Sequence, residues 1–120
     1  MELRLSQLSK TWILDLDGTL VIHNGYKTYG MDKWLTGSKE FLLSIPEKDM
    51  IIFVTSREKS YARVTEQFLR QNGIRYDYII YDAPYGERIL LNDKKPSGLQ
   101  TAYAVNCQRD GIIDLRVKVE

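Results

Sequence analysis

Trp12-Ile13-Leu14-Asp15-Leu16-Asp17-Gly18-Thr19-Leu20 is the stretch that decides the fold of this chain. Its first three residues are apolar, which predicts a short strand that is buried on both faces. Two carboxylates follow, one leucine apart, and in a continuing strand they would share a face and repel each other. Gly18 indicates that the strand opens here. Both carboxylates then fan out at the strand's carboxyl end, where ligands bind in open α/β sheets.

Length and charge set the class of protein. The 120 residues predict a single domain over 1–120, and 17 basic against 16 acidic residues leave a net charge of +1. This balance argues against nucleic acid or an anionic membrane as a partner. No apolar run approaches the roughly 20 residues of a membrane span, and residues 1–5 lack the apolar core of a signal peptide. We therefore expect a soluble, cytoplasmic protein, with its one cysteine, Cys107, a buried reduced thiol.

The rest of the chain alternates strand and helix patterns. Apolar runs predict strands over 50–54, 78–81, 88–91 and 102–105, and helical spacing predicts helices over 38–45 and 59–72. This alternation predicts a parallel sheet with right-handed crossovers. The link over 82–87 is too short for a parallel crossover, so the third or fourth of the five strands is misassigned or antiparallel.

The remaining segments are less regular. Residues 20–37 are rich in turn residues and aromatic side chains, which predicts a loop or small hairpin flap. Residues 112–119 alternate apolar and polar side chains, as an edge strand does. Residues 1–10 are an exposed lead-in or a short edge segment.

Polar side chains follow three of the predicted strands and would meet at one rim of the sheet. Asp15, Asp93 and the backbone carbonyl of Asp17 form an oxygen-only set, which suits Mg²⁺ rather than zinc. The hydroxyls and amides of Thr55 and Ser56, together with a lysine after Asp93, suit a phosphate dianion.

Such a rim predicts phosphate chemistry. Once the phosphate charge is offset by the metal and the lysine, a carboxylate can approach phosphorus, so Asp15 is the candidate nucleophile. Asp17 is the candidate acid that protonates the leaving oxygen and later activates water.

These motifs resemble those of the haloacid dehalogenase superfamily. Asp15-Leu16-Asp17-Gly18-Thr19-Leu20 resembles its DxDGT signature, 53–57 its second motif, and Asn92-Asp93 its fourth. The resemblance spans roughly 11–108 and implies a Rossmann-like three-layer sandwich, Mg²⁺ held by Asp15, Asp17 and Asp93, and an aspartyl-phosphate at Asp15. Within the superfamily, 88–98 resembles small phosphatase-like proteins of capsule and lipopolysaccharide biosynthesis. That match implies a small phosphorylated sugar as substrate.

The chain departs from the family in two ways. The third motif, a Lys or Arg on a helix before the fourth motif, has no counterpart in 82–87, so Lys95, Lys94 or Arg88 must supply the charge. We favour Lys95 because Pro96 fixes the backbone beside it. Only about 35 residues separate Asp17 from Thr55, which leaves no room for a cap domain. An open site implies either a large substrate or closure by a neighbouring subunit, and the tyrosine-rich stretch 76–85 favours self-association.

Two other functions fit the same residues. The first is a non-catalytic module that binds metal or phosphate through the aspartate site. The second is a phosphatase that acts on a macromolecular phosphate, which the missing cap would permit.

Overall fold

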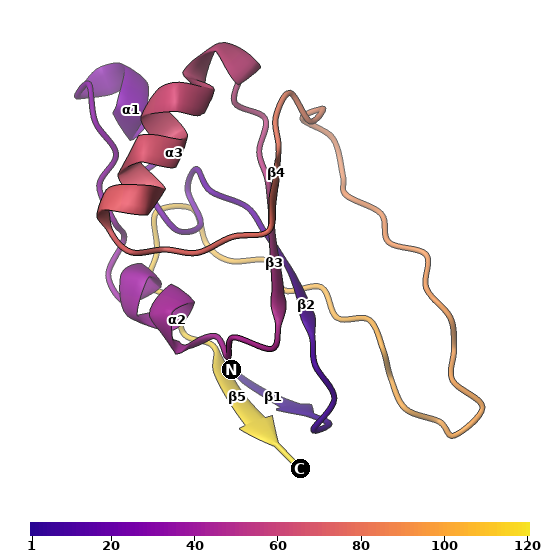
Figure 1. Ribbon diagram of the computed structural model, residues 1–120. Coiled ribbons are helices and arrows are strands. Elements are labelled where there is room, and N and C mark those ends of the chain that lie inside the picture. Colours follow the sequence, from indigo (N-terminus) through magenta and orange to yellow (C-terminus); the bar gives the residue numbers. More distant parts are fainter.

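A computed structural model describes all 120 residues as an α/β fold around a three-stranded parallel sheet (Figure 1). The strands are β2 (Thr11–Leu14), β3 (Met50–Val54) and β4 (Tyr78–Ile80), in the spatial order β2-β3-β4. Each strand is parallel to its neighbour. The predicted parallel α/β architecture is therefore confirmed, as are the predicted strands near 12–14, 50–54 and 78–81.

One face of this sheet is packed and the other is open. Leu14 lies opposite Phe53, and Phe53 lies opposite Ile79, so these side chains share the packed face with the rest of the core. Phe53 is fully buried there. Side chains at alternate positions point to the other face. We call that face the open face, and its apolar residues are Ile13, Met50, Ile52, Val54, Tyr78 and Ile80.

Both longer helices cover the packed face. They are α2 (Ser38–Ser44) and α3 (Ala62–Gln71), the latter preceded by the short 3-10 turn η1 (Lys59–Tyr61), and both were predicted. Figure 1 shows them on the same side of the sheet. The predicted three-layer sandwich is therefore corrected to a two-layer arrangement. Residues 82–115 form no helix that could cover the second face of the sheet.

The two ends of the chain form a separate pair of strands. β1 (Glu2–Leu5) and β5 (Arg116–Val119) run parallel, with residue 2 opposite residue 116. The predicted edge strand in the tail is confirmed, and the first residues are a strand that pairs with it rather than a free lead-in.

The flap over 20–37 folds back on itself. An antiparallel bridge between Val21 and Trp34 closes its base, and the buried side chains of Leu20 and Leu35 anchor it in the body of the protein. Its tip holds one helical turn, α1 (Gly25–Thr28). Residues 20–37 are therefore a short folded-back segment between β2 and α2.

The strands predicted over 88–91 and 102–105 are wrong, because residues 81–115 contain no regular element. The link over 82–87 is too short to return the chain to the amino end of the sheet, where a further parallel strand would have to begin. The chain therefore runs away from the sheet after β4. We call residues 83–106 the arm, which Figure 1 shows on the side away from α2 and α3. Its two limbs meet where Thr101 Oγ1 donates to the Asp93 carbonyl at 2.7 Å.

The prediction for Cys107 is also wrong, since its thiol is exposed. Its apolar neighbours belong to the segment that was expected to be a buried strand and is not one. No helix in the chain has both the length and the apolar character needed to span a bilayer.

Candidate active site

Asp15 and Asp17 lie just beyond the carboxyl end of β2, as the sequence predicts. The chain turns immediately after them: the N–H groups of Leu20 and Val21 both donate to the Leu16 carbonyl, at 2.9 and 3.2 Å. The Leu16 side chain between the two acids is buried in the core. Leu16 thereby fixes the turn, and the two carboxylates on either side of it have separate surroundings.

Asp15 is the more accessible of the two. Its Oδ2 accepts a hydrogen bond from Thr19 Oγ1 at 2.9 Å, and its Oδ1 accepts one from the Arg88 guanidinium at 3.1 Å. The Asp15 side chain remains 36% exposed. A carboxylate that is oriented from one side and open on the other can meet a ligand from solvent.

Asp17 is held by Arg57, which stands three residues beyond the end of β3. Arg57 Nε donates to Asp17 Oδ2 at 2.9 Å and Arg57 Nη2 donates to Asp17 Oδ1 at 3.0 Å, so the two residues form a bidentate ion pair. The same guanidinium pairs with Asp32 of the flap, at 2.9 and 2.6 Å, and donates to Thr65 of α3 at 2.9 Å. One buried arginine thus ties together the β2 turn, the flap and α3.

This cluster is deeply buried. The side chains of Arg57 and Asp32 are 1% and 2% exposed, and the Arg57 guanidinium lies 3.9 Å from the centre of the Tyr26 ring. Burial alone would lower the pKa of Arg57, but the hydrogen bonds and charges of Asp32 and Asp17 outweigh it and raise that pKa. Burial and the charge of Asp17 also raise the pKa of Tyr26. The arginine is therefore a fixed cation and the tyrosine a neutral ring beneath it.

Thr55 and Ser56 follow β3 next to the acid pair. Since Leu14 pairs with Phe53, Thr55 stands at the same end of the sheet as Asp15. Thr55 is fully buried, and its Oγ1 accepts a hydrogen bond from the Arg57 N–H at 3.1 Å, which leaves the hydroxyl proton free to donate. Ser56 is half-buried and its hydroxyl reaches only the Pro84 carbonyl, at 3.5 Å.

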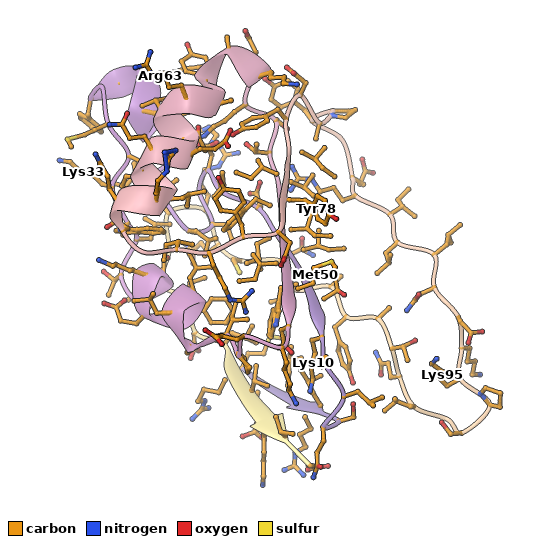
Figure 2. The ribbon with its side chains drawn as sticks, viewed as in Figure 1. Lys10, Lys33, Met50, Arg63, Tyr78 and Lys95 are labelled. Atoms are coloured by element: carbon orange, nitrogen blue, oxygen red, sulfur yellow. The ribbon has the colours of Figure 1, made fainter.

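The three candidate cations lie in different places. Arg88 contacts Asp15 at 3.1 Å. Lys94 and Lys95 are exposed on the arm, and Figure 2 shows Lys95 at its tip, level with Lys10 at the far end of β2. Of the three, the structure brings Arg88 to the acid pair and leaves the favoured Lys95 away from it.

The magnesium site expected from Asp15, Asp17 and Asp93 is not assembled within one chain. The first two acids share the end of β2, whereas Asp93 is exposed on the arm, where its carbonyl accepts a bond from Thr101. No group of three His, Cys, Asp or Glu side chains is placed to hold a metal ion. In this arrangement the donors therefore do not fit the octahedral oxygen set that Mg²⁺ requires.

A turn near the carboxyl terminus covers the loop after the acids. Gly18 has φ +80°, and a β-carbon there would lie 3.1 Å from the Arg109 Cγ atom. The Asp110 N–H donates to the Gly18 carbonyl at 2.8 Å, and its carboxylate accepts from the His23 N–H at 2.8 Å. Asp110 therefore clamps the acid loop to the flap.

The sequence did not predict the roles of Arg57, Asp32 and Asp110. Arg57 was visible as the residue after the Thr-Ser pair, but nothing in its neighbours indicates a buried guanidinium. Asp110 precedes Gly111, and Asp32 lies two residues after Gly30, both in turn-like stretches. A solvated turn is the ordinary interpretation of such residues, and only the tertiary fold distinguishes them from it.

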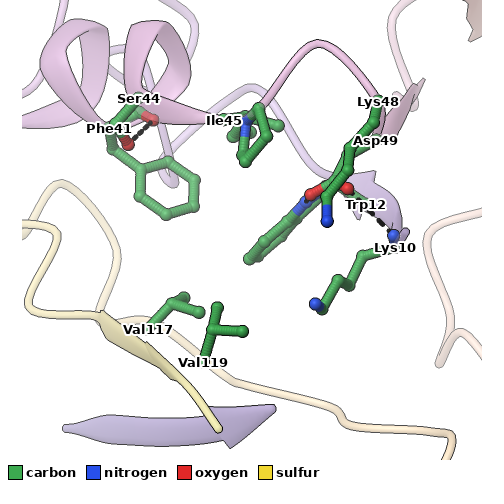
Figure 3. Close-up of a pocket in the computed structure, with 10 residues that line it drawn as sticks. Lys10, Trp12, Phe41, Ser44, Ile45, Lys48, Asp49, Val117 and Val119 are labelled. Atoms are coloured by element: carbon green, nitrogen blue, oxygen red, sulfur yellow. Dashed lines mark hydrogen bonds between the residues drawn. The ribbon is translucent and has the colours of Figure 1, made fainter. Parts of the chain in front are cut away.

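A cavity of about 170 Å³ lies at the other end of the sheet, away from the acid pair (Figure 3). It opens between α2 and β5, and Trp12, Phe41, Val117 and Val119 line it. Beside it the buried Asp49 accepts hydrogen bonds from the Lys10 N–H and the Trp12 indole, both at 3.0 Å. This carboxylate is satisfied by its protein partners, so the cavity is a packing gap between the two sheets.

Comparison of the chain with protein-family models, curated proteins and solved structures finds no match.

Proposed function

We propose that this protein is a phosphomonoester hydrolase of the haloacid dehalogenase type, with a Rossmann-like fold, that works through an aspartyl-phosphate at Asp15. The observation that carries the proposal is the setting of Asp15. Its carboxylate stands at the carboxyl end of a parallel strand, open to solvent, with Thr19 on one oxygen and the Arg88 cation on the other. Such a carboxylate is oriented for attack and lies beside a charge that attracts phosphate.

The proposed reaction has two steps. Asp15 Oδ attacks phosphorus, the bond from phosphorus to the alcohol oxygen breaks, and Asp17 gives that oxygen a proton. Water then attacks phosphorus, the bond from phosphorus to Asp15 Oδ breaks, and phosphate leaves. Asp17 takes the proton from the water, which restores the protonated carboxyl with which it began the first step. Because Arg57 occupies both oxygens of Asp17, the acid step requires this carboxyl to turn away from Arg57.

Phosphate binding falls to groups around the β3 end. We assign the exposed face of Ser56 as a hydrogen-bond donor to the phosphate oxygens. The hydroxyl of Thr55 is the second assigned donor, and because Thr55 is fully buried, phosphate binding must open the structure around it. The cation that we assign is Arg88, whose guanidinium turns from Asp15 to the incoming phosphate. A planar guanidinium suits that task because it can donate two parallel hydrogen bonds to one phosphate group. Lys95 enters this assignment only if the arm is carried to the site.

Mg²⁺ is the cofactor that the family resemblance implies, and Asp15, Asp17 and Asp93 would hold it only if the arm brought Asp93 to the acid pair, which it does not do in this structure. A small phosphorylated sugar of surface-polysaccharide biosynthesis, met in the cytoplasm, is the proposed substrate, and it rests on the resemblance of 88–98 alone. The absence of a cap favours one alternative, a phosphate on a macromolecule, because no lid restricts the size of the leaving group.

A non-catalytic module is the second candidate function. Two observations favour it: Arg57 holds both oxygens of the expected acid, and the three expected metal ligands are not together. A module of this kind would bind a metal or phosphate at Asp15 without turnover.

The decisive experiment is phosphate release from a broad panel of phosphomonoesters, with and without Mg²⁺. We expect release that depends on Mg²⁺ and disappears in Asp15→Asn. Arg88→Met should raise KM for phosphate esters at least tenfold, on the scale of about 1.4 kcal/mol for a charged hydrogen bond, whereas the matched surface control Arg4→Met should not. Activity that survives Asp15→Asn would remove Asp15 as the nucleophile. A silent panel would favour the non-catalytic module.

A further inference from the structure

One arginine near the carboxyl terminus lies against the acid loop. A β-carbon on Gly18 would lie 3.1 Å from the Cγ atom of Arg109 and 3.7 Å from its Nε atom. The Arg109 side chain therefore packs along the backbone of Gly18, the residue that directly follows Asp17. The proposed reaction gives this guanidinium no task, although it stands beside the acid pair.

The other two guanidiniums at this site already have carboxylate partners. Arg57 forms an ion pair with Asp17. Arg88 forms one with Asp15. Arg109 takes part in none of the ion pairs of the chain. It is exposed, so its N–H donors are available to a ligand from solvent.

The turn that carries Arg109 is fixed on two sides, which holds the base of its side chain beside the acid loop. The Asp110 N–H donates to the Gly18 carbonyl at 2.8 Å, and the Asp110 carboxylate accepts from the His23 N–H at 2.8 Å. Asp110 itself has φ +56°, a left-handed conformation that few residues other than glycine adopt. Contacts on both sides keep it there, and backbone of this kind is common at ligand sites.

A phosphate dianion that approaches Asp15 needs positive charge that is not already paired, because like charges repel. Arg57 stays inside its buried network, and Arg88 must leave Asp15 before it can bind phosphate. Arg109 can meet an anion without breaking an ion pair. Its planar guanidinium can donate two parallel hydrogen bonds to two oxygens of one phosphate or carboxylate group.

We infer that Arg109 is a substrate-binding residue of this site, which holds an oxyanion of the substrate at the Gly18 side of the acid loop. The reacting phosphate is the first source of that oxyanion, since every substrate of the proposed reaction carries it. An acidic group on the alcohol is the second source, because Gly18 adjoins Asp17, the proposed acid for the leaving oxygen. The identity of the substrate rests on the proposed function, whereas the binding of an oxyanion does not.

Calorimetric titration with two anions tests the inference without turnover. The probes are inorganic phosphate and phosphonoacetate, which carries a carboxylate beside its phosphonate. We expect Arg109→Met to bind both at least about tenfold more weakly than the wild type. Arg109→Lys keeps the charge but loses the planar fork, so its affinity should be intermediate. The matched control is Arg63→Met, which alters an exposed arginine of α3 and should bind as the wild type does.

The two probes distinguish the two sources of the oxyanion. Equal losses on both probes would place Arg109 on the reacting phosphate. A loss on phosphonoacetate alone would place it on an acidic group of the alcohol. A wild type that binds neither probe would overturn the inference, as would an Arg109→Met variant that binds both with unchanged affinity.

Folding and turnover are measured beside the titration. Arg109 is exposed and unpaired, so Arg109→Met should unfold at the temperature of the wild type, and a lower affinity then reports the lost guanidinium. Failure of the proposed hydrolase would have a different signature: anion binding that depends on Arg109, with no phosphate release from any ester.

Discussion

Arg57 makes the clearest difference between the two acids of the DxD pair. It engages both oxygens of Asp17 at 2.9 and 3.0 Å and leaves Asp15 to Thr19 and Arg88. Two residues that look equivalent in the sequence therefore have unlike neighbours, one fixed inside a buried ion network and one open to solvent. The exposed carboxylate is the proposed nucleophile, whereas the acid role proposed for Asp17 requires its carboxyl to leave Arg57.

Removing this guanidinium should destabilise the protein strongly. In Arg57→Met, Asp32 would remain 2% exposed without its cation, and loss of one partner of a buried pair costs about 3–5 kcal/mol. We expect a drop of that size in the free energy of unfolding, measured in urea. The matched control is Arg57→Met/Asp32→Leu, which removes both charges and should recover part of the loss. A drop below about 1 kcal/mol in the single variant, the scale of a surface pair, would show that the network is solvated.

At the scale of elements, α3 is joined to the sheet through a shared carboxylate. Glu66 of α3 accepts hydrogen bonds from Tyr81, just after β4, at 3.0 Å and from Tyr76, just before it, at 3.2 Å. Burial, then the hydrogen bond and charge of Glu66, raise the pKa of Tyr81 well above its ordinary value, and burial and Glu66 raise that of Tyr76. Both phenols are therefore held protonated in the folded state.

This arrangement predicts a loss of stability at alkaline pH. Above about pH 10 a tyrosine in the unfolded chain loses its proton while Tyr81 in the folded protein keeps it, so the free energy of unfolding falls as pH rises. Tyr81→Phe should lose about 1 kcal/mol at neutral pH, with the hydrogen bond, and show a shallower decline above pH 10. The exposed Tyr29→Phe is the control and should follow the wild type in both respects. An unchanged alkaline slope in Tyr81→Phe would contradict the account of this contact.

The sequence predicted well those helices and strands whose formation follows from the apolar pattern of their own residues. Runs such as Met50–Val54 and the helical spacing over 62–71 are buried by neighbours that any parallel sheet provides. Residues 88–91 have the same apolar pattern and form no strand, because the short link after β4 and the hold of Arg88 on Asp15 send them the other way. An apolar pattern shows that a segment is suited to a buried strand, but it does not show whether the chain brings that segment beside another strand.

The residues of the candidate site also separate into those that the sequence placed correctly and those that it did not. Asp15, Asp17 and Thr55 were predicted to come together because consecutive parallel strands place their carboxyl ends side by side. Asp93 and Lys95 were expected there on the assumption of a further strand, and within one chain they lie elsewhere. Asp32 and Asp110 approach the acid loop through the flap and a distant turn, and such long-range contacts leave no local signal in the sequence.

At the scale of the whole molecule, the sheet is covered on one face only, and the arm that could cover the other extends from it (Figure 1). A two-layer body with an uncovered apolar face and an unpaired strand edge is an incomplete unit.

The central claim is that Asp15 carries the phosphoryl group. The most direct measurement is the mass of the protein after acid quenching during turnover of a phosphate ester, followed by peptide mapping. We predict the added mass of one phosphoryl group on the peptide that contains Asp15, lost on treatment with hydroxylamine and absent in Asp15→Asn. Turnover with no phosphorylated protein in the quenched sample, or phosphate on any other residue, would contradict the claim.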